Sequence, residues 1–278
     1  MAIGGRRSKP VQQMKGKRSV RPPAVAGQFY TRDATRLALE VQNFIDAAPL
    51  YDGPRPKALI APHAGYMYSG KIAGIAFAAG KNVLPRVTRV VVIGPAHYVP
   101  FRGIALATAD AFETPLGRIS LDRAALAAIR DLPCMRADNA PHAPEHALEV
   151  ELPFLQMLLP EFLLVPLVVG HAQPEEVGEV LARLWGGDET LVVVSSDLSH
   201  YHDYATAQRL DAATASAIEQ GEWESLGSQN ACGFLPVAGL LREATRHQLQ
   251  ARRLALCNSG DTAGDKARVV GYGAWTFA

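Results

Sequence analysis

Short apolar runs alternate with longer amphipathic stretches along most of the chain. The apolar runs predict buried strands, and stretches in which apolar residues recur every three or four positions predict helices. The expected strands cover residues 57–61, 89–93, 104–107, 163–169, 191–194, 253–257 and 269–277. The expected helices cover residues 33–48, 69–79, 121–130, 145–159, 175–185, 205–219 and 235–245. Pro153 is expected to kink or divide the helix over 145–159.

This alternation predicts an α/β fold with a mainly parallel or mixed central sheet and helices on both of its faces. With 278 residues, of which 48% are hydrophobic, the chain is long and apolar enough for one large core. No break in composition and no repeat of solenoid type divides it. We therefore expect one domain over residues 21–278, preceded by an arm over residues 1–20.

The charge is uneven, because the arm contains six basic residues and no acidic one. It has no apolar periodicity and is predicted to be disordered. The formal net charge of the chain is only +1, which does not favour binding to nucleic acid. No apolar run approaches the roughly 20 residues that cross a bilayer, and no signal sequence follows the arm. The three cysteines form no C-x-x-C pair, so a reducing cytoplasm is the simplest location.

Three of the predicted strands end directly in polar residues. His63 follows the first strand, His97 follows the second, and Asp197 with His200 follows the strand over 191–194. In open α/β sheets ligands bind beyond the carboxyl ends of the strands, so these side chains are expected to share one crevice. Imidazole nitrogens suit iron, copper, zinc and nickel, which makes a metal site one interpretation.

Two further segments are ambiguous from pattern alone. Glu145 and His146 begin a predicted helix, where they either point into the crevice or cap the helix. Cys232 lies between two helical stretches, and a turn there would place its thiolate at a helix start, where the dipole lowers a thiol pKa. The alternative for Cys232, as for Cys134 and Cys257, is an ordinary small core residue.

Several common catalytic motifs are absent from the sequence. It has no G-x-S-x-G elbow, no Walker A loop and no H-E-x-x-H helix. Ser195, Ser196, Asp197 and His200 imitate a serine triad in composition. However, adjacent residues of a strand point to opposite faces, so one segment does not build a triad.

Taken together, the segments closely resemble the Memo family, known in prokaryotes as protein B of the AmmeMemoRadiSam system. The resemblance runs from about Arg21 to the C-terminus and leaves only the arm uncovered. The matching segments, in chain order, are residues 26–30 (AGQFY), 60–66 (IAPHAGY), 94–97 (GPAH), 112–116 (FETPL), 145–149 (EHALE), 195–197 (SSD) with His200, and 232–233 (CG).

The resemblance implies a fold similar to the LigB-type class III extradiol dioxygenases. It also implies a metal site whose ligands are His63, His97 and Cys232. Asp197 and His200 are implied to lie in the same crevice. The pocket is expected to be lined by Glu145, His146, Tyr66 and Tyr98. Tyr98 is a departure, because some family members carry a second histidine there.

The leading hypothesis is therefore a redox protein or dioxygenase-like oxidoreductase that holds Fe(II), with copper or zinc as alternative metals. His200 is the expected general acid and base, since an imidazole titrates near neutral pH, and Asp197 is expected to orient it. A thiolate replaces the carboxylate of the dioxygenases, so catechol cleavage does not follow from the fold. The substrate, a small molecule or a peptide, is not specified.

Two other functions are compatible with the same residues. One is a non-catalytic binding or adaptor component, for which the resemblance implies a radical-SAM protein and an AMMECR-type protein as partners in an unidentified modification. The other is a zinc-dependent hydrolase, because two histidines and one cysteine with an open position also suit catalytic zinc.

Overall fold

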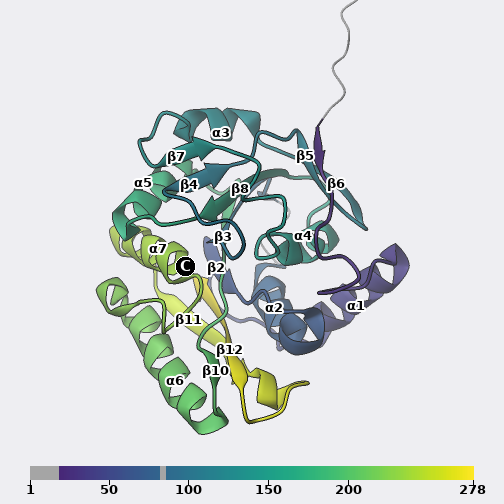
Figure 1. Cartoon of the computed structure of the whole chain (residues 1–278), viewed down its shortest axis with the longest axis vertical. Helices are drawn as coiled ribbons and strands as arrows, with labels where there is room; N and C mark the ends of the chain where they lie inside the picture. Colours follow the sequence, from purple (N-terminus) through teal and green to yellow (C-terminus); the bar gives the residue numbers. More distant parts are fainter. Residues whose placement is uncertain (1–18, 82–85) are drawn as a thin grey trace, which may run out of the picture.

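A nine-stranded mixed sheet runs through the middle of the computed structural model, which describes residues 19–81 and 86–278 (Figure 1). Nearly all of the predicted basic arm thus lies outside the described residues. The strand order is β10-β12-β2-β9-β3-β8-β4-β7, with β11 paired to β12. The strands are β2 (Ala58–Ala61), β3 (Arg89–Pro95), β4 (Ile104–Leu106), β7 (Met135–Ala137), β8 (Leu163–Val169), β9 (Thr190–Ser195), β10 (His200–His202), β11 (Ala251–Asn258) and β12 (Val269–Phe277).

Helices flank this sheet, as the sequence predicted. They are α1 (Ala34–Asp46), α2 (Tyr66–Gly80), α3 (Arg123–Ile129), α4 (Leu152–Leu158), α5 (Pro174–Leu184), α6 (Tyr204–Gln220) and α7 (Phe234–Arg246). In Figure 1, α1, α2 and α4 lie together on one side, and α5, α6 and α7 on the other. No helix among the described residues combines the length and the apolar character needed to cross a membrane.

The first part of the predicted helix over 145–159 is wrong. Residues 145–148 are not helical, a 3-10 turn covers Glu149–Glu151, and α4 begins only at Leu152. Pro153 occupies the first turn of α4, where its missing N–H has no intrahelical partner to lose. The segment before it is therefore free to follow the sheet edge and to carry Glu145 and His146 there.

A small second sheet of three strands, β1 (Val20–Arg21), β5 (Ala111–Thr114) and β6 (Gly117–Ser120), was not predicted. Its strands are two to four residues long, which is too short for a clear periodic pattern. β1 pairs in parallel with β5, so the start of the described chain is fixed beside residues 111 and 112.

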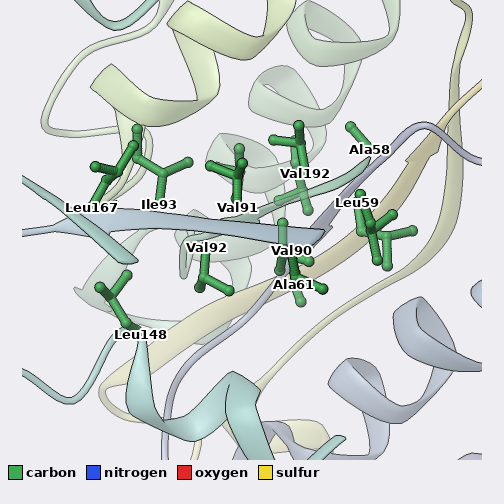
Figure 2. Close-up of a cluster of buried hydrophobic side chains, with 14 of the residues drawn as sticks. Ala58, Leu59, Ala61, Val90, Val91, Val92, Ile93, Leu148, Leu167 and Val192 are labelled. Atoms are coloured by element: carbon green, nitrogen blue, oxygen red, sulfur yellow. The ribbon is translucent and has the colours of Figure 1, made fainter. Parts of the chain in front are cut away.

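The core is built around the central parallel strands β2, β9 and β3. Their side chains alternate between the two faces, as Figure 2 shows for Val91 and Ile93 on one side and Val92 on the other. These three residues are completely buried. Burial on both faces explains why such strands read as continuous apolar runs rather than as alternating patterns. Because the three strands are parallel, their carboxyl ends meet at one edge of the sheet.

Candidate functional site

Three histidines meet at that edge. His63 follows β2, His97 follows β3, and His146 comes from the segment before α4. Each offers a ring nitrogen that lies within 4.8 Å of those of the other two. The ring centroids of His63 are 5.1 Å from those of His97 and 5.3 Å from those of His146, and the rings of His97 and His146 stack at 4.5 Å. The group is therefore compact enough to hold one metal ion.

The ring of His63 is fixed by a hydrogen bond to Ser195, the last residue of β9. Its Nδ1 lies 2.8 Å from Oγ of Ser195, and that hydroxyl lies 2.6 Å from the carbonyl oxygen of Ala147, which can only accept. Ser195 therefore donates its single proton to Ala147, and Nδ1–H of His63 donates to Ser195. This tautomer leaves the Nε2 lone pair of His63 free for a ligand.

His97 is held by Glu145. Its Nδ1 lies 2.8 Å from Oε1 of Glu145, and its backbone N–H donates to Oε2 at 2.7 Å. Burial alone would raise the pKa of Glu145, yet the hydrogen bonds from His97 outweigh it and hold this pKa below its usual value. An ionised carboxylate on Nδ1–H directs Nε2 of His97 to the ligand side, an arrangement typical of metal-binding histidines.

His146 was expected only to line the pocket, but the structure makes it the third member of the histidine group. Its ring packs between His97 and Phe29, with a centroid distance of 4.6 Å to Phe29. Its buried Nδ1 makes no hydrogen bond among the described residues, although it lies 3.3 Å from Oε1 of Glu145. Burial, with the neighbouring His97, lowers its pKa to about 4. The ring is therefore neutral at pH 7, and a buried nitrogen without a hydrogen bond suits a ligand.

Cys232 lies beside His63, with 3.2 Å between Sγ and Nε2. The thiol is placed by the turn before α7, where Gly233 packs against β9 so closely that an added Cβ would lie 2.6 Å from Cβ of Ser196. Burial raises the pKa of the Cys232 thiol, and the nearby Asp197 adds to this effect. Without a metal, the neutral thiol is therefore a donor to Nε2 of His63.

Asp197 and His200, the predicted catalytic pair, both lie at this edge. The carboxylate of Asp197 accepts the backbone N–H of His63 at 2.8 Å, so it holds the turn that presents the imidazole. Burial raises the pKa of Asp197 to about 7. Nδ1–H of His200 donates to the carbonyl of Leu198 at 2.8 Å, which leaves its Nε2 free. Burial lowers the pKa of His200, so the ring is neutral and able to accept a proton.

The two tyrosines predicted for the pocket lie in different surroundings. Tyr66 is buried, and its hydroxyl donates to the carbonyl of Val150 at 2.7 Å, so it ties α2 to the segment that carries His146. Tyr98 is 51% exposed, and its ring centroid lies 5.6 Å from that of His146. It therefore lies at the rim of the site.

Glu149 anchors the segment that carries Glu145 and His146, a role that sequence reasoning did not assign. Its buried carboxylate pairs with Arg21 of β1 and accepts the backbone N–H of Ala24 at 2.7 Å and of Val25 at 3.0 Å. Arg21 also donates to the carbonyl of Glu145 at 2.6 Å. Because all these donors belong to residues 21–25, this segment holds the backbone that carries Glu145 and His146 in place.

The donor set fits a transition metal. Nε2 of His63 and of His97 have free lone pairs, and burial with neighbouring histidines holds the pKa of His63 well below its usual value, so no proton competes there. Donors on one ion, each about 2.0–2.3 Å from it, lie roughly 3–4 Å apart. The 3.2 Å between Nε2 of His63 and Sγ of Cys232 is compatible with this spacing. However, the group of donor atoms that all lie within 4.8 Å of one another contains the three histidines and not Cys232.

Known proteins match this chain over most of its length. The family model described as "Memo-like protein" matches residues 21–276. A "MEMO1 family protein" of Aquifex aeolicus is 34% identical over 265 residues, which cover 91% of this chain and 97% of that protein. Proteins of the same description from Methanosarcina mazei and Aeropyrum pernix are 34% and 35% identical and are covered over 98% of their length.

Proposed function

Because the chain belongs to the Memo-like family, we propose that it binds one redox-active metal ion, iron, and acts as a dioxygenase-like oxidoreductase on a small organic ligand. The proposed ligands are His63, His97 and Cys232, and His146 is a fourth donor. The observation that carries the proposal is the lone pair on Nε2 of His63, which faces the Cys232 thiol and lies in a group with two other imidazoles.

Iron is proposed because the resemblance implies a fold similar to the LigB-type extradiol dioxygenases; the donor set alone also suits copper and zinc. Imidazole nitrogens and a thiolate suit iron and copper, and the open edge of the sheet leaves room for further ligands. When bound, iron would supply electron-transfer chemistry that no side chain of the site offers. A zinc-dependent hydrolase remains the alternative for the same donors, and the identity of the bound metal separates the two.

The protein's own residues would handle protons and position. His200, neutral and with Nε2 free, accepts a proton from the ligand and returns it later. Asp197 and Ser195 hold the backbone and the ring of His63, and Glu145 does the same for His97. Tyr98, at the rim of the site, would contact the organic ligand as it enters.

Metal analysis of purified protein tests the proposal. Wild type, His63→Ala, His97→Ala, Cys232→Ala and a control, His171→Ala, which changes an exposed histidine outside the group, are purified without oxygen and analysed by inductively coupled plasma mass spectrometry. We expect about one iron per chain in wild type and control and a loss of at least tenfold in the three ligand variants. Equal metal content in all five would refute the proposal.

A second candidate is a binding component that works with a radical-SAM protein and an AMMECR-type protein. Three large exposed side chains favour it: Met67 in α2, Tyr98 after β3 and Tyr201 in β10 are 65%, 51% and 64% exposed. Contiguous exposed apolar side chains are typical of partner surfaces, and this candidate function requires these three residues to form one such surface. Affinity capture from the native host with wild type and a Tyr98→Ser, Tyr201→Ser variant tests it. Stoichiometric recovery of a radical-SAM protein with wild type alone supports this function, and equal recovery with both refutes it.

A further inference from the structure

A cavity of about 430 Å³ lies next to the histidine group and has no role in the proposal so far. It lies between the segment over 27–32, the start of α1 and the start of α2. Its volume is within the range of small-molecule sites. Phe29 connects the cavity with the histidine group, because it lines the cavity and its ring centroid lies 4.6 Å from that of His146.

The walls of this cavity are positively charged. Arg32 and Arg36 line it, against one acidic residue, Glu40. Neither arginine forms a salt bridge within the described part of the chain. Arg32 uses Nε and Nη2 to donate to the carbonyl of Ala26, at 3.2 and 2.9 Å, which leaves its Nη1 free. Guanidinium groups with free donors are typical partners of carboxylates and phosphates.

The start of α2 adds to this field. Its N-cap is Gly65, which has no side chain to satisfy the first-turn N–H groups. The N–H of Tyr66 donates to the carbonyl of Phe29 at 2.8 Å, whereas that of Met67 has no partner among the described residues. Tyr66 and Met67 both line the cavity. A helix N-terminus with unpaired N–H groups attracts anions, so it reinforces the two arginines.

We propose that this cavity binds the anionic group of the site's ligand, which is thus a small organic acid or phosphate ester whose apolar part contacts Phe29, the residue whose ring packs on His146. The inference rests on the proposed function, since it names the class of that function's ligand. It also gives a role to the AGQFY segment, whose backbone and side chains build one wall of the cavity.

Three probes of the same length test the proposal: 3-phenylpropionate, 3-phenylpropyl phosphate and the neutral 3-phenylpropan-1-ol. Each is titrated by calorimetry into metal-free wild type, Arg32→Gln, Arg36→Gln and Arg102→Gln, the last changing an exposed arginine outside this cavity. We expect at least one anion to bind at least tenfold more tightly than the alcohol. Either cavity variant should lose about tenfold in anion affinity, and the control should lose nothing. The tighter anion identifies the ligand as a carboxylate or a phosphate.

The second readout is the NMR signal of the His146 ring in histidine-labelled, metal-free protein, assigned with His146→Asn. Anion binding should shift this signal in wild type. Equal affinity for anions and alcohol, equal affinity of the cavity variants and wild type, or an unmoved His146 signal would each overturn the proposal. Both readouts use metal-free protein, so they test anion binding independently of the metal analysis, which is made on separate, metal-containing preparations of the same variants.

Discussion

Sγ of Cys232 lies 3.2 Å from Nε2 of His63, although 169 positions separate the two residues in the chain. The contact joins the end of β2 to the turn before α7, across β9. It depends on Gly233, whose missing side chain lets the turn approach Ser196. It also depends on Ser195, which fixes the ring of His63 with Nε2 outward. Gly233 and Ser195 together therefore place Sγ of Cys232 next to Nε2 of His63.

Metal binding is expected to release a proton from Cys232. Burial raises the pKa of this thiol above its usual value, whereas a metal-bound thiol is deprotonated. The release of this proton alone should therefore raise the affinity for the metal by about tenfold for each unit by which the pH increases. In Cys232→Ser the slope should fall by about one proton, and Cys257→Ser is the matched control. Chelator competition between pH 6 and 8 measures it, and equal slopes in all three proteins would contradict the account.

Glu145→Gln is expected to weaken metal binding by about 10–100-fold without unfolding the protein. The amide keeps the size of Glu145 but not its charge, so Nδ1–H of His97 loses an ionised acceptor. Chelator competition gives the affinity, and circular dichroism checks the fold. Glu113→Gln, which changes a surface partner of Arg118, serves as control. If Glu145→Gln binds metal as tightly as this control, the carboxylate does not support His97.

Glu151 is expected to be a neutral acid. Ser195 Oγ lies 2.6 Å from the carbonyl of Ala147, 2.8 Å from Glu151 and 2.8 Å from Nδ1 of His63. Its one proton goes to Ala147, so the other two groups must donate, and burial raises the pKa of Glu151 accordingly.

Glu151→Gln, which keeps a neutral donor, should change the free energy of unfolding by less than about 1 kcal/mol. Glu151→Ala leaves Ser195 with a lost partner and should cost about 1–3 kcal/mol. Urea unfolding at pH 7 measures both. Equal losses in the two variants would mean that Glu151 is charged or that its bond to Ser195 is unimportant.

His142 is expected to make the fold sensitive to acid. Burial lowers its pKa to about 4, against 6.5 in the unfolded chain, so the unfolded state binds the proton first as the pH falls. His142 therefore does not lower the free energy of unfolding above pH 6.5, and it lowers this free energy by up to about 3 kcal/mol as the pH falls to 4. Nε2–H of His142 donates to the carbonyl of Ala105, a bond that Gln can replace.

His142→Gln should therefore lose less stability than wild type between pH 7 and pH 4. Urea unfolding at several pH values gives the difference, with His171→Gln as an exposed control. Parallel pH profiles for wild type and His142→Gln would show that His142 does not contribute to acid sensitivity.

Much of the fold followed from pattern, because long elements have a clear period. The strand over 163–169 and the helices α6 and α7 lie within a residue or two of expectation. The β5–β6 hairpin was missed because its strands are only four residues long. The helix predicted over 145–159 was too long. Its apolar periodicity does not show that residues 145–148 leave the helix to lie along the sheet edge.

The site was less predictable than the fold. Residues after strand ends pointed to His63 and His97, since parallel strands end together. Nothing local marked Ser195 and Glu151 as supports of His63, because their contacts are long-range. His146 was noticed as a pocket residue, but its place in the histidine group depends on a segment without regular structure. The sequence signal for it was Glu145, an acid directly before a histidine.

The central claim is that imidazoles and a thiolate surround one iron ion at the carboxyl edge of the sheet. A crystal structure of protein purified without oxygen, with anomalous data collected above and below the iron edge, tests it most directly. We expect a single iron peak within about 2.0–2.4 Å of Nε2 of His63, Nε2 of His97 and Sγ of Cys232. An iron peak elsewhere, or no anomalous peak among these atoms in iron-soaked crystals, would contradict the account.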